Sequence, residues 1–113
     1  MKISLGKYPK SHKATRKIKV HIDNFDCWNL DDTLALIIHP ALVRFKETCV
    51  STPSYLTRPQ WTKALDHMIE TFRRMSDDDY SEFSGTPAQI RKNVKFIDKG
   101  LLLFATHFRS LWN

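Results

Sequence analysis

The amino-acid sequence predicts a mainly α fold, a three-helix antiparallel bundle with a short basic N-terminal β-strand or hairpin attached at one edge. Three stretches repeat apolar residues at the three- and four-residue steps of an amphipathic helix, and short connections separate them. An earlier stretch alternates apolar and polar residues, which is the period of a strand. With three glycines and five prolines, the composition argues against a disordered, collagenous or turn-rich all-β chain.

Residues 17–22 form the predicted strand. Ile18, Val20 and Ile22 alternate with polar residues, so one face of this strand is expected to be buried. A lone strand leaves its backbone groups unpaired, and it therefore needs a neighbour. The neighbour is either residues 2–8 folded back as a hairpin or the same strand of a second subunit, and the second alternative predicts a homodimer or higher oligomer through strand 17–22.

The first helix is predicted from about residue 30 to residue 48. Asn29 is a candidate N-cap, and the aspartates that follow it suit the positive end of the helix dipole. Pro40 lies inside this pattern, and because the apolar face continues beyond it we expect a kink rather than two helices. The face is made by Leu34, Ile37, Ile38, Ala41, Leu42 and Phe45.

The second and third helices share one start signal. Thr57 with Gln60 and Thr86 with Gln89 are capping boxes, and each has a proline in the first turn. The second helix is expected to end near Met75. The third carries a heptad-like seam and further apolar residues beside it, so it is expected to pack against both other helices. The seam residues are Ile90, Val94, Ile97, Leu101, Phe104, Phe108 and Leu111.

Positive charge is concentrated at the N-terminus. The net charge is +6, but residues 1–22 hold seven basic side chains and no acidic one, which leaves 11 basic and 12 acidic side chains in the rest. The sequence therefore divides into a basic arm, residues 1–16, and a single helical domain, residues 17–113. Clustered lysines and arginines neutralise phosphates, so nucleic acid is a possible partner through the arm.

The sequence argues against several protein classes. No apolar run approaches the roughly 20 residues of a membrane helix, and the basic N-terminus lacks the apolar core of a secretory signal. Two cysteines without C-x-x-C spacing favour reduced thiols over a disulfide framework or a zinc site. We expect a cytosolic protein that does not contact a membrane.

The densest polar cluster precedes the first helix and could hold a metal or act as acid and base. Its spacing matches no metal motif, and capping explains part of it without a ligand. We therefore expect no metal, no cofactor and no catalytic residue. The histidines His39, His67 and His107 lie on three different predicted helices, where lone histidines usually have structural roles. The cluster consists of His21, Asp23, Asp26, Asp31 and Asp32.

Two groups of residues are candidates for binding a ligand or partner. One belongs to the strand and the turn after it, where Phe25 and Trp28 form either a hydrophobic staple or a stacking platform. The other is a basic stripe on the third helix, which is either a solvated face or one wall of a groove shared with the arm. Trp61 and Trp112 fall on or beside apolar seams and are predicted core. The candidates are Lys17, Lys19, His21, Asp23, Phe25, Asp26, Trp28, Arg91, Lys95 and Lys99.

Three segments resemble a family of small uncharacterised proteins of tailed bacteriophages. They are HIDNFDCWNLDDTLALII from His21, W-x-x-x-L-D-x-M-I-x-x-F from Trp61, and G-L-x-L-F-x-x-x-F-x-x-L-W from Gly100. The resemblance covers roughly residues 17–113 and not the basic arm, and family members often carry a longer acidic insert at residues 76–86. It implies a phage protein acting in the host bacterial cytoplasm, and it favours Asp23, Asp26 and Trp28 as binding residues.

The predicted function is that of a non-enzymatic phage protein that engages a host component, as a counter-defence (immune evasion) factor. It would bind a host protein through the strand and exposed aromatic residues, or sequester a phosphorylated nucleotide. The leading alternative is a nucleic-acid-binding accessory protein. A third hypothesis is a metal-dependent phosphohydrolase that uses His21, Asp23 and Asp26.

Overall fold

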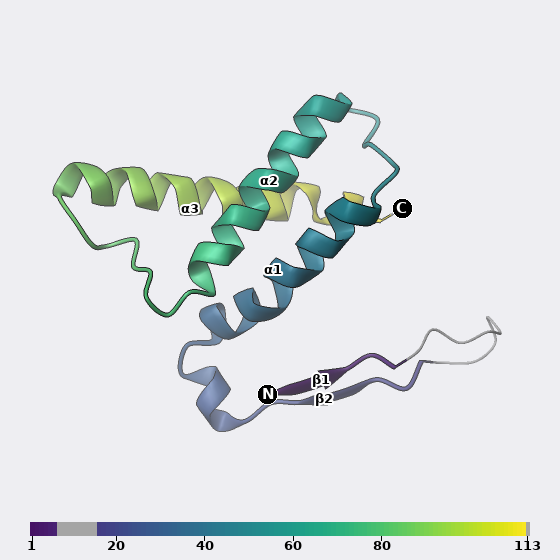
Figure 1. The fold of residues 1–113 in the computed structure, drawn as a ribbon, viewed down its shortest axis with the longest axis horizontal. Coiled ribbons are helices and arrows are strands. Elements are labelled where there is room, and N and C mark those ends of the chain that lie inside the picture. The colour runs from purple at the N-terminus through teal and green to yellow at the C-terminus, as the bar shows by residue number, and fades with distance from the viewer. Residues whose placement is uncertain (7–15, 113) are drawn as a thin grey trace.

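The computed structural model describes residues 1–6 and 16–112. It is mainly helical with an N-terminal antiparallel hairpin, which confirms the predicted fold class (Figure 1). Much of the predicted arm, residues 7–15, lies outside the described residues. The elements are β1 (Lys2–Ser4), β2 (Lys19–His21), η1 (Asn24–Cys27), α1 (Leu30–Thr48), α2 (Arg58–Met75), α3 (Pro87–His107) and η2 (Phe108–Ser110), where η marks a short 3-10 helix.

Local capping signals determine where α2 and α3 begin. The Thr57 side chain accepts a hydrogen bond from the Gln60 amide, and the Gln60 side chain accepts one from the Thr57 amide at 2.9 Å. Thr86 and Gln89 repeat this reciprocal pair at the start of α3, so both predicted capping boxes are confirmed. Helix α1 continues through Pro40, which confirms a single helix on both sides of the proline.

Helix α2 is the central helix of the body. It lies beside α1 and is crossed by α3 (Figure 1), and backbone contacts join it to both. Among the described residues, α3 has no backbone contact with α1. It reaches the α1 side through Phe104, and Leu111 beyond its end packs against the same core. No helix in the described part of the chain is long and apolar enough to cross a membrane.

The core is built mainly by α1 and α2. Trp61 and Met68 are the largest of its fully buried side chains. The Trp61 ring meets Phe45 of α1 edge to face, with 6.5 Å between the ring centroids, and Phe72 meets Phe104 in the same way at 5.0 Å. The buried cluster consists of Ala35, Leu42, Cys49, Trp61, Ala64, Leu65, Met68 and Phe72.

Helices α2 and α3 cross at a glycine. A Cβ atom at Gly100 would lie 1.8 Å from Oγ1 of Thr71, far inside any permitted contact. Thr71 is fully buried, and its hydroxyl donates to the carbonyl of His67 at 2.8 Å. Because the Thr71 side chain occupies the space where a Cβ atom at position 100 would lie, glycine at this position allows α2 and α3 to approach this closely.

The predicted third helix is too long at its C-terminus. Helix α3 ends at His107 and a 3-10 turn follows, so the chain leaves the helical path before Leu111 and Trp112. Leu111 still packs against the core, but Trp112 is 68% exposed. The prediction that Trp112 belongs to the core is wrong because it assumed that the helix continues to Trp112, whereas α3 ends at His107.

An ion-pair cluster near the end of α2 gives a testable pH dependence. Arg73 donates twice to Glu70 at 2.8 Å and Arg74 donates once at 2.9 Å, and these bonds, those from Arg73 foremost, lower the pKa of Glu70 to about 2. A carboxylate with a lowered pKa stabilises the fold above its ordinary pKa of 4.5. That stability is lost as the pH falls toward 2, when Glu70 becomes protonated in the folded protein.

Acidification from pH 5 to pH 2.5 should lower the free energy of unfolding, measured in urea, of both the wild type and Glu70→Gln. We expect this decrease to be about 1 kcal/mol smaller in Glu70→Gln than in the wild type. The value is small because the Glu70 side chain is 36% exposed and water screens the pair. The matched control is Glu47→Gln, which breaks a more exposed ion pair with Arg44 and should have a smaller effect. If the free energy of unfolding of Glu70→Gln fell with pH as steeply as that of the wild type, the prediction would be contradicted.

Candidate functional site

The N-terminal strands pair within one chain. β1 and β2 are antiparallel, and Lys2 lies opposite His21, Ile3 opposite Val20 and Ser4 opposite Lys19. Of the two neighbours considered for the strand, the folded-back N-terminal segment is therefore the one present. β2 covers Lys19–His21, three residues of the predicted strand 17–22.

One face of this hairpin is apolar and open to solvent. Side chains alternate between the faces of a strand, so the apolar residues of both strands share one face. Burial was predicted for Ile18, Val20 and Ile22, but these and the apolar residues of the N-terminal segment are exposed, because β1 and β2 make backbone contacts only with each other among the described residues. Figure 1 shows the hairpin below α1 with no helix against it. We call Ile3, Leu5, Ile18, Val20 and Ile22 the apolar hairpin face.

The opposite face of the hairpin is basic. Lys19 and His21 alternate with the apolar residues, and Lys2 lies opposite His21 on the same side. Lys17 lies two residues before Lys19, just outside β2, and is exposed. Within the described part of the chain, no ion pair joins these three lysines to a carboxylate. The hairpin is thus apolar on one face and positively charged on the other.

Three of the five residues of the predicted polar cluster, His21, Asp23 and Asp26, lie together in the structure. Nε2 of His21 donates to Asp23 at 2.8 Å, and the Met1 amine lies 2.9 Å from Asp26 and 3.3 Å from Asp23. The hydrogen bond from His21 is the main cause that lowers the pKa of Asp23, and the bond from the amine is the main cause for Asp26. Because these groups satisfy one another, they fix the end of the hairpin against η1.

Asp31 and Asp32 lie elsewhere, in a cleft of about 380 Å³. Burial is the main cause that raises the pKa of Asp32, and Asp31 and Asp78 raise it further. Most of the carboxylates here come from the loop between α2 and α3, so the sequence pattern before α1 could not reveal the grouping. Across the described residues, no three His, Cys, Asp or Glu side chains are placed to hold a metal ion. The acidic side chains in the cleft are Asp31, Asp32, Asp77, Asp78 and Glu82.

Phe25 and Trp28 form an exposed aromatic pair. Their ring centroids are 5.0 Å apart and the rings are tilted by 49°. Their exposed fractions are 71% and 77%. A hydrophobic staple would bury one ring against the helix, so the exposure favours the interpretation as a contact platform. The pair follows the hairpin directly in the chain. We use the name N-terminal apolar surface for the apolar hairpin face and this exposed pair taken together.

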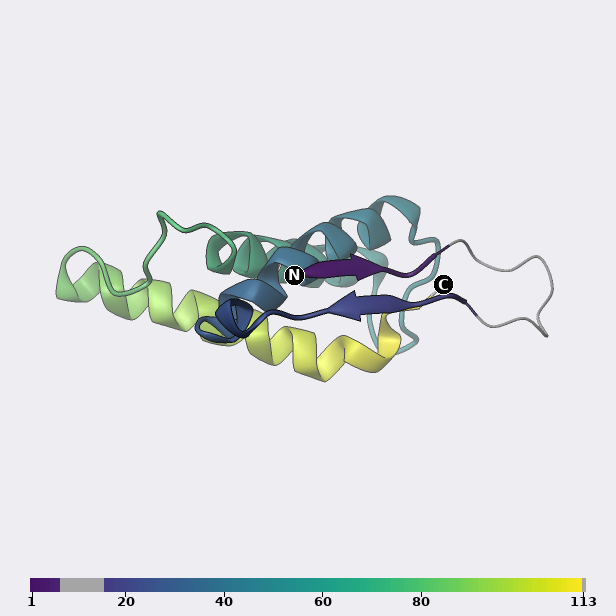
Figure 2. The same ribbon diagram turned by 90° about the horizontal axis from the view of Figure 1, so that it is seen from below.

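The basic stripe of α3 stays apart from the hairpin. Arg91, Lys95 and Lys99 are all exposed, but α3 makes no backbone contact with either strand among the described residues. In Figures 1 and 2 the beginning of α3 extends away from the hairpin. The structure therefore does not bring the stripe and the hairpin lysines into one groove. Lys99 instead lines a cleft between α2 and α3.

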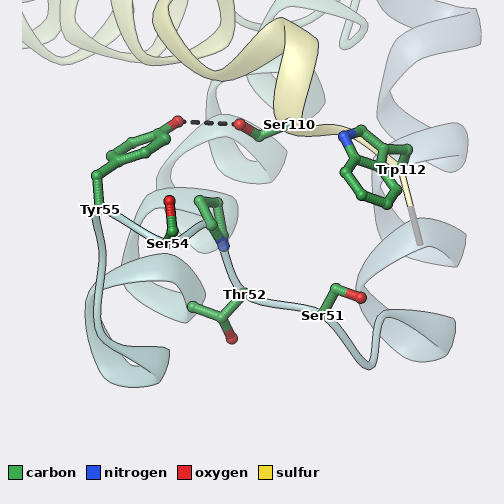
Figure 3. A pocket seen from close by; sticks show the side chains of 7 residues that line it. Ser51, Thr52, Ser54, Tyr55, Ser110 and Trp112 are labelled. Carbon is green, nitrogen blue, oxygen red and sulfur yellow. Dashed lines mark hydrogen bonds between the residues drawn. The ribbon is translucent and has the colours of Figure 1, made fainter.

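A further cleft, of about 360 Å³, lies between the loop after α1 and the C-terminal segment (Figure 3). The Tyr55 hydroxyl is hydrogen-bonded to Ser110 at 3.0 Å and to Nδ1 of His107 at 2.9 Å. Arg58 donates to the backbone oxygen of Cys49 at 2.9 Å, which holds the loop in place. Sequence reasoning missed this site because its hydroxyl groups come from two distant segments and form no motif. Its lining residues are Ser51, Thr52, Pro53, Ser54, Tyr55, Ser110 and Trp112.

No protein-family model, curated protein or solved structure matches this chain. What the protein binds must therefore be inferred from its own surfaces. Of the predicted site residues, those between Lys17 and Trp28 lie together on the hairpin and η1, whereas the three on α3 lie on a separate part of the molecule.

Proposed function

We propose that this chain is a non-enzymatic binding protein that captures a host protein through its N-terminal apolar surface. The supporting observation is that seven large apolar side chains between residues 3 and 28 are each 40–77% exposed. Soluble proteins that act alone rarely keep such residues together in water, because burying them is favourable. Aromatic residues such as Trp28 are also enriched among the residues that contribute most to protein interfaces.

The charge around this surface suggests what kind of partner fits. Lys2 and Lys19 line the reverse side of the same hairpin without a carboxylate partner in the described chain. Because these lysines lie on the face opposite the apolar one, they act through the positive potential of the whole hairpin, which favours encounter with an acidic partner. The partner we propose is an acidic protein surface with exposed apolar side chains.

The biological setting of the proposal follows from the sequence resemblance. A phage protein acting in the host bacterial cytoplasm would use this surface to occupy a host protein, which suits a counter-defence role. Nucleotide sequestration by the hairpin lysines and the α3 stripe is less favoured, because these two described basic groups lie on separate parts of the molecule. Protein capture requires no such convergence.

A capture experiment followed by a purified binary assay tests the proposal. The full chain is used to capture proteins from a bacterial lysate, and each captured protein is then purified and titrated by calorimetry. We expect Val20→Glu to weaken binding about 100-fold, because it places a like charge at the centre of the contact. Val20→Lys should weaken binding only about tenfold, since it removes apolar contact but keeps the attractive sign of charge.

The control is Leu102→Glu, which makes a comparable change at a side chain of α3 that is 67% exposed. Its affinity should equal that of the wild type. Equal affinities for Val20→Glu and the wild type would contradict the proposal. So would a wild-type dimer in light scattering that Val20→Glu dissociates, because a second copy would then occupy the surface. Capture of nucleic acid with a steep salt dependence would favour the nucleic-acid alternative instead.

A further inference from the structure

Two lysines without acidic partners in the described chain line one cleft between α2 and α3. Some other cations of the body are paired with carboxylates, as Lys46 is with Asp66. Lys63 of α2 and Lys99 of α3 have no ion pair among the described residues. Both line one cleft of about 300 Å³, so two positive charges converge on a space that the chain leaves open.

The remaining lining suits an organic anion. Gln60, His67 and His107 contribute polar groups, and no acidic side chain lines the cleft. Leu56 and Leu103 provide an apolar floor. The volume is at the lower end of ligand pockets, which span roughly 300–1,000 Å³, and it suits a ligand of small-molecule size.

The two imidazoles are held in fixed positions. Nε2 of His67 donates to the carbonyl of Phe96 at 2.9 Å, and the His67 ring stacks on the Phe96 ring at 4.0 Å. Nδ1 of His107 is hydrogen-bonded to the Tyr55 hydroxyl at 2.9 Å. Because their outer bonds are already made, both rings are oriented before any ligand arrives, which reduces the entropic cost of binding.

We propose that this cleft binds a small phosphomonoester that carries an apolar or aromatic group. The phosphate lies between Lys63 and Lys99, which act on it as point charges. The organic group lies on the floor formed by Leu56 and Leu103. This site uses surfaces of α2 and α3 and does not depend on the N-terminal apolar surface, so it can be tested independently of the proposed protein capture.

Titration of the full chain with AMP, adenosine and inorganic phosphate tests this site. AMP is expected to bind and to shift the imidazole resonances of His67 and His107, whereas adenosine should bind at least tenfold more weakly because it lacks the charge. Lys63→Met and Lys99→Met should each weaken AMP binding about tenfold, the usual loss for one charged contact. Lys92→Met removes the same charge from α3 at an exposed position outside the cleft and should leave the affinity unchanged.

Three results would overturn the proposal. Equal binding of AMP and adenosine would remove the role of the phosphate, and equal binding of phosphate and AMP would remove the role of the apolar floor. Equal losses in Lys92→Met and Lys99→Met would show attraction to the whole basic helix rather than to the cleft. Both cleft lysines are exposed, so circular dichroism spectra of the variants should match the wild type.

Discussion

A Trp61→Ala variant is expected to lose about 3–5 kcal/mol of the free energy of unfolding in urea. Trp61 is 1% exposed and its ring lies edge to face against both Phe45 and His107. Removal of the indole leaves a cavity between three separate segments, which cannot all collapse into it. Because domains of this size have only about 5–15 kcal/mol of stability, the variant should be partly unfolded at moderate temperature.

Trp61→Phe separates the shape of the side chain from its polar group. The indole Nε1 is buried and has no hydrogen-bond partner among the described residues. An unpaired buried donor is unfavourable, so its removal offsets part of the lost contact area. We expect Trp61→Phe to cost about 1–2 kcal/mol. Equal losses in the phenylalanine and alanine variants would contradict the assignment of Trp61 as a space-filling core residue.

The second large effect is expected at the crossing of α2 and α3. Alanine in place of glycine inside a helix normally stabilises it by about 1 kcal/mol. At Gly100 the sign should reverse, with a loss of about 1–3 kcal/mol, because the new Cβ atom would overlap the Thr71 side chain. Urea unfolding of Gly100→Ala and of the wild type measures the effect. A Gly100→Ala variant that is as stable as the wild type, or more stable, would contradict the prediction.

A double variant identifies the cause of that loss. Thr71→Ala removes the Oγ1 and Cγ2 atoms that a Cβ at Gly100 would approach to 1.8 and 2.6 Å, but it keeps the Thr71 Cβ at 2.5 Å. Addition of Thr71→Ala to Gly100→Ala should therefore restore part of the stability and not all of it. Strictly additive losses in the double variant would show that the two residues are not in contact.

Features encoded by neighbouring residues were predictable from the sequence. The starts of α2 and α3 follow from Thr57 and Thr86, whose capping partners lie three residues away. The apolar faces of α1 and α2 follow from spacing, and residues such as Leu42 and Met68 are buried as expected. The end of α3 was not predictable in this way, because His107 is hydrogen-bonded to Tyr55 from a distant loop and no glycine or proline marks the stop.

Features that depend on packing between elements were not predictable. The alternation in the strand correctly indicated an apolar face, but burial also requires an element to cover it, and none does in the described chain. Gly100 carried no signal because its role depends on which face of α2 it meets. The cleft between α2 and α3 joins Lys63 to Lys99, residues too far apart in sequence to suggest a common site.

The central position of α2 has a consequence for how the fold is lost. Within the described chain, α1 and α3 share no backbone contact and meet through side chains such as Phe104, so the two helix interfaces are linked mainly through α2. Fraying of α1 alone or α3 alone leaves the other interface intact, whereas disruption of α2 removes both together. The cooperativity of unfolding therefore depends on one helix, and amide protons in the middle of α2 should exchange with solvent only when the whole domain opens.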